Sequence, residues 1–220
     1  MIPLSDADRR PLHLPRVTGL IIVVNVVVFL LELAGGDTFI SRWALVPADI
    51  VAGRGWITVL TSMFTHGGWM HIVGNMLFFW VFGPEIEDVM GSARYLLFYL
   101  LGGLAATFAQ VTVAPTSTVP NLGASGAIAA VMGAFLITYP RDRIRTVLLF
   151  GWFTRVTFIP AVILVGMWFL TQVLSEVGTL VETQTGGVAY MAHIGDSVFG
   201  ALFSRPLETR QRRVEQGLEP

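Results

Sequence analysis

The stretch Asn121-Leu122-Gly123-Ala124-Ser125-Gly126-Ala127-Ile128 puts a hydroxyl between two glycines, at the start of an uncharged run that continues to Thr138. A Gly-x-Ser-Gly sequence at a helix start is a candidate nucleophile site. Glycine lets backbone and substrate approach closely, and the free amides of a helix N-terminus bind developing negative charge. Gly, Ala and Ser are also the residues that let membrane helices pack closely. The stretch alone leaves both interpretations open until a general base is found elsewhere.

The composition indicates a membrane protein of one domain. Of the 220 residues, 54% are hydrophobic and 13% are charged, and the mean hydropathy is +0.68. A soluble domain carries about 25% charged residues. The chain has no cysteine, which excludes disulfides, thiol catalysis and Cys-ligated zinc. Because no basic stripe with interleaved aromatic residues occurs, we expect no nucleic-acid partner.

The apolar runs predict six spanning helices. They cover residues 17–31 (extended to 34), 69–82, 95–113, 122–139, 158–174 and 188–203. The segment 37–68 is too interrupted to span and too apolar for a solvated loop, so an interfacial or re-entrant position is expected. We therefore predict one helical domain over residues 17–205, a mobile N-terminal tail over 1–16 and a C-terminal tail over 206–220.

Arginine alone sets the predicted orientation, because the chain has no lysine. With six spans, one side holds both termini and the loops after spans two and four. That side carries twelve arginines and the opposite side only Arg42 and Arg54. The positive-inside rule then makes both termini cytoplasmic. The twelve are Arg9, Arg10, Arg16, Arg94, Arg141, Arg143, Arg145, Arg155, Arg205, Arg210, Arg212 and Arg213.

Three chemically capable residues fall at similar depth beneath the side opposite these arginines. They are His71 in span two, Ser125 in span four and His193 in span six. An ionisable group inside a membrane segment usually faces the protein interior or a wet cavity and marks function. A serine needs a base, and imidazole suits that task, so Ser125 and His193 form a candidate dyad. The alternative for His193 is a hydrogen bond between helices.

A developing oxyanion would need fixed donors near this dyad. His71 and Asn75 are four residues apart, share a helix face and both carry hydrogen-bond donors. Together with the backbone N–H of Ser125 they would form an oxyanion hole. The alternative for His71 and Asn75 is a polar packing contact.

The sequence predicts no metal and no cofactor. His66 and His71 are five apart and share a helix face poorly, and no His-Glu-x-x-His sequence occurs. Glu85, Glu87 and Asp88 are interpreted as a solvated loop or a helix-capping cluster.

These residues together resemble the rhomboid family of intramembrane serine proteases. The resemblance covers the segment before span two and spans two to six. The matching residues are Gly123-Ala124-Ser125-Gly126, His66-x4-His71-x3-Asn75, Ala192-His193, and Glu87 with Gly91 after span two.

The resemblance implies an all-α, six-helix bundle with a membrane-embedded first loop, both termini cytoplasmic and a water-filled cavity that opens outward. Ser125 would be the nucleophile and His193 the base, with His71 and Asn75 on the oxyanion. The partners would be transmembrane substrates in a lipid bilayer, cut near their outer ends. Span five would move to admit them. The expected location is a cell membrane, the prokaryotic inner membrane, with the active site opening to the outer side.

Two departures from the family pattern qualify this prediction. Trp56-Ile57 stands where the family often has Trp-Arg, and Asp196 replaces a glycine that follows the base histidine. Asp196 either orients the imidazole, as the third member of a triad does, or loosens the bundle and lowers activity. A weakly active or non-catalytic protein that binds transmembrane helices is therefore the alternative function. A small-molecule transporter is less favoured, because the sequence has no inverted repeat.

Overall fold

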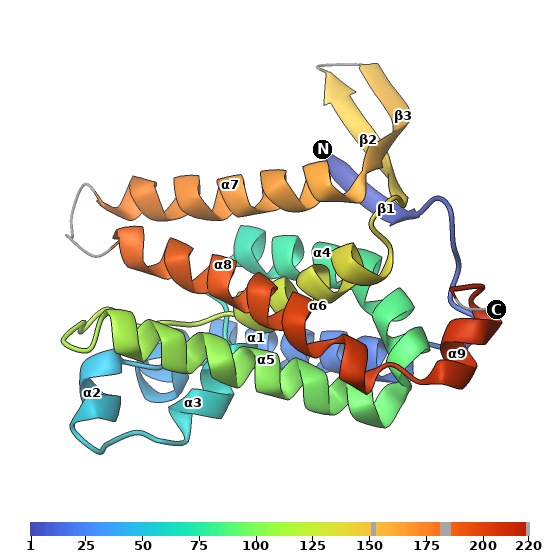
Figure 1. The fold of residues 1–220 in the computed structure, drawn as a ribbon. Coiled ribbons are helices and arrows are strands. Elements are labelled where there is room, and N and C mark those ends of the chain that lie inside the picture. Colours follow the sequence, from blue (N-terminus) through green and yellow to red (C-terminus); the bar gives the residue numbers. More distant parts are fainter. Residues whose placement is uncertain (151–152, 181–185, 219–220) are drawn as a thin grey trace.

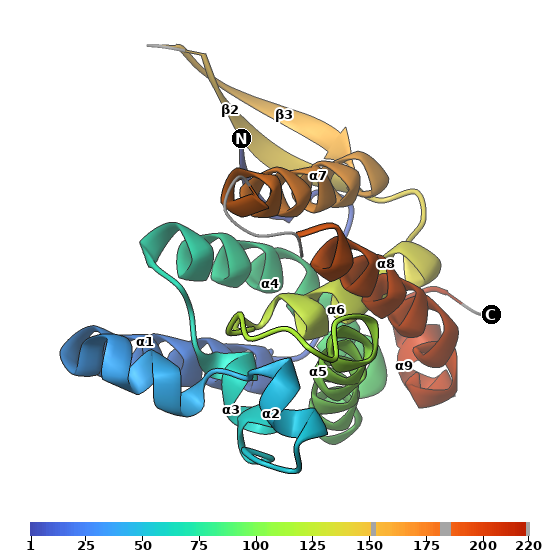
Figure 2. The same cartoon turned by 90° about the vertical axis from the view of Figure 1, so that its left-hand side faces the viewer.

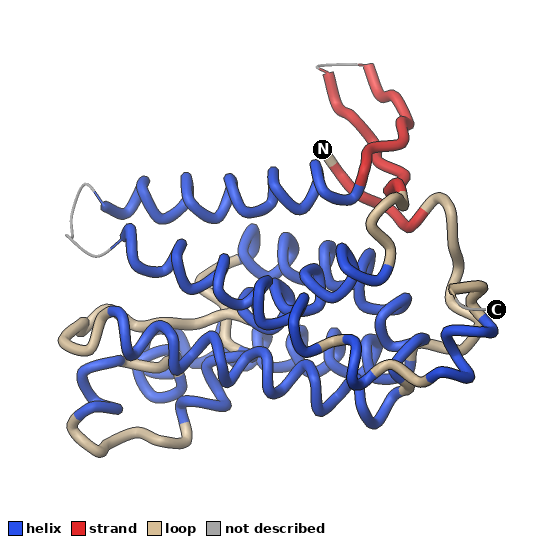
Figure 3. Tube along the Cα trace, viewed as in Figure 1, coloured by secondary structure: helices blue, strands red, loops and turns tan. Residues whose placement is uncertain are grey.

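The structure is a computed structural model that describes residues 1–150, 153–180 and 186–218. Within these ranges it describes all side chains except those of residues 150, 153, 172–180 and 186–194. Six long helices make up most of the chain (Figures 1 and 3), and each overlaps a predicted span. They are α1 (Arg16–Trp43), α4 (Trp69–Met90), α5 (Ser92–Val113), α6 (Ser125–Thr138), α7 (Ala161–Leu180) and α8 (Gly186–Phe203).

Helix α6 is the centre of the bundle. It contacts α4, α5, α7 and α8, and Figure 2 shows it enclosed among them. Twelve of its fourteen residues are buried. Most of these are Gly, Ala or Ser, which let the neighbouring helices come close. The uncharged run after Ser125 is therefore a buried core helix.

Helices α6 and α8 touch backbone to backbone. A Cβ added at Gly200 would lie 1.9 Å from the carbonyl oxygen of Ala130, and one at Gly133 would lie 2.0 Å from that of Ser197. The hydroxyl of Ser197 donates to the carbonyl of Ala129 (2.9 Å). Gly126 of α6 lies against Asp196, and Ala130 lies against Gly200, four residues further along each helix, so α6 and α8 run parallel in a fixed register.

The chain between α1 and α4 folds into short helices beside the bundle. Helix α1 bends at Gly36, where φ is +57°, and α2 (Pro47–Val51), α3 (Thr58–Thr61) and the 3-10 turn η1 (Ser62–Phe64) follow. α2 and α3 pack against α5. None of these elements has the length to cross a bilayer, as expected for this segment.

A three-stranded antiparallel sheet projects from the bundle (Figure 1) and was not predicted. Its order is β1 (Ile2–Asp6), β2 (Arg143–Phe150) and β3 (Phe153–Pro160). The all-α prediction is therefore wrong for these residues, and the N-terminal segment is a paired strand rather than a mobile tail. Along Arg143–Val147, exposed arginines alternate with the buried Ile144 and Thr146, which is the period of a strand with one buried face.

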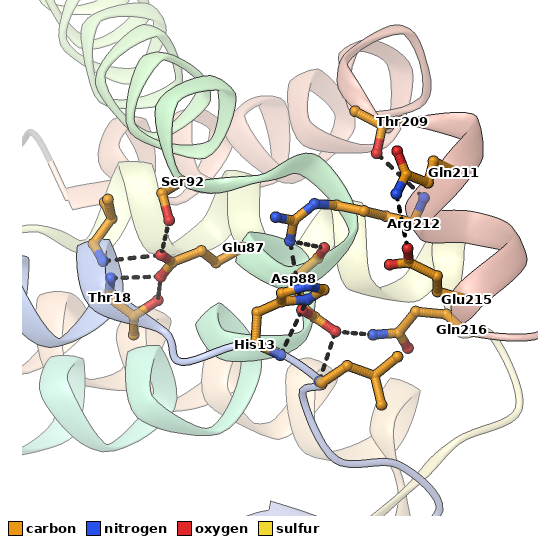
Figure 4. A network of polar contacts seen from close by, with 12 residues as sticks. His13, Thr18, Glu87, Asp88, Ser92, Thr209, Gln211, Arg212, Glu215 and Gln216 are labelled. Atoms are coloured by element: carbon orange, nitrogen blue, oxygen red, sulfur yellow. Dashed lines mark hydrogen bonds and ion pairs between the residues drawn. The ribbon is translucent and has the colours of Figure 1, made fainter.

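Both terminal segments are fastened to the end of α4 (Figure 4). The side chain of Asp88 accepts hydrogen bonds from the backbone of Leu12 and His13 and pairs with the His13 ring. From the other end of the chain, Gln216 donates to the same carboxylate and Arg212 forms an ion pair with it (3.6 Å). Arg212 and Gln216 belong to the C-terminal helix α9 (Arg210–Glu215) and the residue that caps it, which follow the 3-10 turn η2 (Arg205–Leu207).

Glu87 caps the start of α1. Its carboxylate accepts from the backbone amides of Val17 (2.9 Å) and Thr18 (2.8 Å), from the Thr18 hydroxyl, and from the hydroxyl of Ser92 (2.7 Å). Pro15, at the N-cap position, offers no side-chain acceptor. The Glu87 carboxylate therefore accepts hydrogen bonds from first-turn amides that would otherwise have no partner within the helix. Glu87 and Asp88 thus form a buried capping cluster and not a solvated loop.

By length and composition, two helices of the described chain qualify as membrane spans, α1 and α5. Helix α6 and residues 161–171 of α7 are apolar but shorter. Helix α4 is long enough but contains His71, Asn75 and an acidic end. The count of six spans stays a prediction.

The α6–α8 contact predicts opposite outcomes for two glycines on the same helix. Gly200→Ala forces the helix backbones apart and destabilises the fold by about 1–3 kcal/mol. Gly195→Ala meets no described atom within 4 Å and leaves stability unchanged or slightly higher. Thermal unfolding in detergent, followed by tryptophan fluorescence, measures the difference. Equal melting temperatures for the two variants would contradict this packing.

Candidate active site

A cavity of about 1190 Å³ lies between α4, α5, α6 and α7. Ser125, the first residue of α6, lines it together with His71 of α4 and Asp196 of α8. Its wall is mostly apolar and includes Phe78 of α4 and Trp168 of α7, whose rings lie 6.0 Å apart. The cavity has room for a peptide segment beside the serine.

The turn before Ser125 is held by backbone hydrogen bonds to the first loop. Gly123 donates to the carbonyl of Ser62 (2.8 Å), and Asn121 exchanges two bonds with Leu45 (2.6 and 2.9 Å). Gly123 has a φ of +124°, a conformation that side chains of L-residues rarely adopt. The first glycine of the Gly-x-Ser-Gly sequence is thus required by the turn itself.

His71 and Asn75 both face this turn. A Cβ added at Gly123 would lie 2.8 Å from Nε2 of His71 and 3.7 Å from Nδ2 of Asn75. The predicted shared helix face therefore brings both donors to the backbone two residues before Ser125. Asn75 is 1% exposed, and neither atom of its amide has a hydrogen-bond partner among the described residues. A buried amide without partners costs free energy unless a ligand satisfies it.

One hydrogen bond fixes the tautomer of His71. The backbone N–H of Gly67 donates to its Nδ1 (3.3 Å), so Nδ1 accepts and the proton of the neutral ring lies on Nε2. Nε2 is the nitrogen that faces Gly123. His71 is thereby prepared to donate a hydrogen bond into the turn.

His66 lies behind His71 and is held by a residue that sequence analysis did not single out. The two imidazole rings are 5.2 Å apart, and the backbone N–H of His66 donates to Oε2 of Glu32 (2.9 Å). Glu32 belongs to α1 and is only 4% exposed. A lone carboxylate within an apolar span is the signal that identifies it. Among the described residues, no group of three His, Cys, Asp or Glu side chains could hold a metal ion.

Asp196 lies directly over the second glycine of the Gly-x-Ser-Gly sequence. Its Oδ2 is 3.1 Å from the position of a Cβ on Gly126, and the Cβ of Ala106 of α5 is 2.3 Å from the same position. Asp196 is 2% exposed, and Oδ2 has no hydrogen-bond partner in the described part of the chain. The carboxylate thus occupies space that the missing side chain of Gly126 leaves.

His193 belongs to α8, but its side chain lies outside the described residues. Glu87 and Gly91 do not line the cavity. Gly91 ends α4 with a φ of +79°, and Glu87 caps α1 as described above. These two residues serve the fold at the opposite end of α4 from His71.

This arrangement of helices and polar groups agrees with the comparisons with known proteins. The family model described as the Rhomboid domain matches residues 53–209. This is more than half of the chain, and it includes the turn, the candidate nucleophile and the capping cluster. The chain belongs to the rhomboid family, whose fold is helical and crosses the membrane several times.

Three relatives illustrate the range of the match. The chain is 29% identical over 204 residues to rhomboid protein 1, mitochondrial, of Saccharomyces cerevisiae, covering 87% of this chain and 55% of that protein. It is 35% identical over 126 residues to rhomboid protease GluP of Bacillus subtilis, covering 56% of this chain and 24% of that protein. It is 33% identical over 150 residues to the human presenilin-associated rhomboid-like protein, mitochondrial, covering 66% of this chain and 37% of that protein. The chain thus spans between about a quarter and about half of these relatives.

These relatives overturn one prediction. The sequence led us to expect a prokaryotic cell membrane, with the site opening to its outer side. Relatives that match between 66% and 87% of the chain are named mitochondrial proteins, so that location is contradicted. Arginine counts distinguish the two faces of a membrane but carry no information about which membrane it is.

Proposed function

We propose that the protein is an intramembrane serine endopeptidase that cleaves transmembrane segments of other membrane proteins, with residues 17–205 as its protease domain. The observation that carries the proposal is the convergence of His71 and Asn75 on the turn that leads into Ser125. A buried amide without a partner among the described residues and a histidine with Nε2–H facing the turn suit an oxyanion better than a packing contact. GluP, a relative, is named a protease.

In the proposed mechanism the Ser125 hydroxyl attacks the scissile carbonyl carbon while His193 removes its proton. Negative charge develops on the carbonyl oxygen. His71 Nε2–H, the Asn75 amide and the backbone N–H of Ser125 donate to that oxygen. His193 then returns the proton to the leaving amine. No metal or cofactor has a role in these steps.

The register of α6 and α8 supports the pairing of Ser125 with His193. Ser197 of α8 is bonded to Ala129 of α6, and the helices run parallel. His193 precedes Ser197 by one turn, and Ser125 precedes Ala129 by one turn. The two residues therefore belong to the same level of adjacent helices.

The proposed topology is six spans with both termini on the arginine-rich face of the membrane. It rests on the twelve-to-two arginine distribution and on the network that ties both terminal segments to the same end of α4. Ser125 lies near the opposite face, so cleavage near that end of a transmembrane substrate is expected. The substrate would enter between α4 and α7, where Phe78 meets Trp168.

Labelling by a fluorophosphonate tests the proposal directly, since the reagent reacts with activated serines. Wild-type protein in detergent is labelled at Ser125. Ser125→Ala abolishes labelling, and His193→Ala slows it on the order of a thousandfold or more. Ser62→Ala, which changes another serine of the same cavity, retains labelling. Folded wild-type protein that takes up no label would favour the alternative, a non-catalytic protein that binds transmembrane helices.

Asp196 decides how active the enzyme is. A buried oxygen without a described partner costs about 1–3 kcal/mol of stability. This cost supports the hypothesis that Asp196 loosens the bundle over the hypothesis that it orients the imidazole of His193. Asp196→Gly then raises the rate of substrate cleavage and raises the melting temperature by about 2–4 °C for each kcal/mol gained. Asp196→Asn, which keeps the shape and removes the charge, is the matched control. A fall in activity in the glycine variant would instead assign Asp196 an orienting role.

A further inference from the structure

A second cavity, of about 940 Å³, lies at the other end of α4 and shares no lining residue with the first. The N-terminal segment from Leu4 to Pro15 forms one wall. The last turns of α4, from Trp80 to Glu85, form another. Arg145 of β2 and Phe158 of β3 complete it. The cavity thus exists only because the N-terminal strand and the β-hairpin fold against the bundle.

Two of its three arginines have no counter-ion among the described residues. Arg9 is paired with Asp142 (2.6 Å), whereas Arg10 and Arg145 are exposed and form no ion pair with any residue of the described chain. They come from different elements, the N-terminal segment and β2, yet line the same cavity. Two unpaired guanidinium groups on one cavity predict an anionic ligand, above all a phosphate.

The acidic residues of the cavity do not neutralise these two arginines. Asp8 is paired with Arg143 (3.1 Å). Asp6 is buried, and its Oδ1 accepts from the amides of Asp8 and Arg9. Burial raises the pKa of Asp6 from 3.8 to about 6, and its carboxylate forms no ion pair with any described residue. Glu85 is also buried, so the exposed charges of the cavity that lack a described ion-pair partner are those of Arg10 and Arg145.

The rest of the cavity wall is formed by apolar side chains that are exposed. Trp80 is 51% exposed, Phe158 55%, Leu12 60% and Leu14 74%. Tryptophan is favoured at the headgroup level of a bilayer, and basic pockets beside membrane helices bind lipid headgroups. A free phosphate ion would use the arginines alone. A phospholipid would use both the cations and the exposed apolar side chains.

We propose that this cavity binds an anionic phospholipid, with Arg10 and Arg145 on the headgroup phosphate and the apolar part of the lipid along Trp80 and Phe158. The bound lipid adds a further link between the N-terminal segment, α4 and the β-hairpin. This site is separate from Ser125, so the inference stands or falls independently of the proteolytic activity.

Native mass spectrometry of the full chain in detergent tests the site. The probes are dioleoyl phosphatidylglycerol, dioleoyl phosphatidylcholine and inorganic phosphate. Wild-type protein binds phosphatidylglycerol in preference to phosphatidylcholine, and the double variant Arg10→Gln/Arg145→Gln binds it about tenfold more weakly or worse. The matched control Arg94→Gln/Arg141→Gln removes two exposed arginines outside the cavity and leaves binding unchanged.

Several results would overturn the proposal. Equal binding of the two lipids by wild-type protein excludes a selective anionic site. An equal loss of phosphatidylglycerol binding in the Arg94→Gln/Arg141→Gln control indicates that the net charge of the protein, and not this cavity, attracts the lipid. Displacement of the lipid by millimolar inorganic phosphate identifies a free-phosphate site. The variant Arg10→Lys/Arg145→Lys keeps both charges and retains most of the binding, whereas loss of binding in this variant as complete as in the glutamine variant contradicts recognition by positive charge.

Discussion

The backbone contact between α6 and α8 is the constraint on which the rest of the site depends. Gly133 and Gly200 let the two helices approach until a carbonyl of each lies where a side chain would be. Helices in a bilayer gain little from the hydrophobic effect when they associate, so close packing must hold them together. The contact also fixes the register of α8 against α6. Any chemistry between the two helices depends on that register.

The polar groups around Ser125 are held in a similar way, by backbone and not by flexible side-chain contacts. The turn at Gly123 is bonded to the first loop, and the amide of Gly67 sets the tautomer of His71. Asp196 is the exception. It fills the space over Gly126 with a carboxylate, one oxygen of which has no partner in the described part of the chain. In our account this residue, and not the serine, limits the activity of the site.

Much of the bundle was predictable from the sequence, because apolar runs and arginine counts report directly on helices that cross a membrane. The convergence of His71, Asn75 and the serine turn followed from helix periodicity. The pairing of residues 2–6 with residues 143–150 was missed because the two segments lie far apart in the sequence. The hairpin of residues 143–160 was missed although exposed arginines alternate there with Ile144 and Thr146, because its arginines were assigned to a loop between two spans. Glu32 was missed because its partner is a backbone amide 34 residues away. The location was mispredicted because composition does not distinguish one membrane from another.

The central claim is that His71, Asn75 and the Ser125 amide form an oxyanion hole. An experimental structure of the fluorophosphonate adduct tests it most directly, because the phosphonyl oxygen mimics the oxyanion. Our account predicts that this oxygen lies within about 3 Å of His71 Nε2, Asn75 Nδ2 and the backbone nitrogen of Ser125. An adduct whose oxygen points away from His71 and Asn75 would contradict the account.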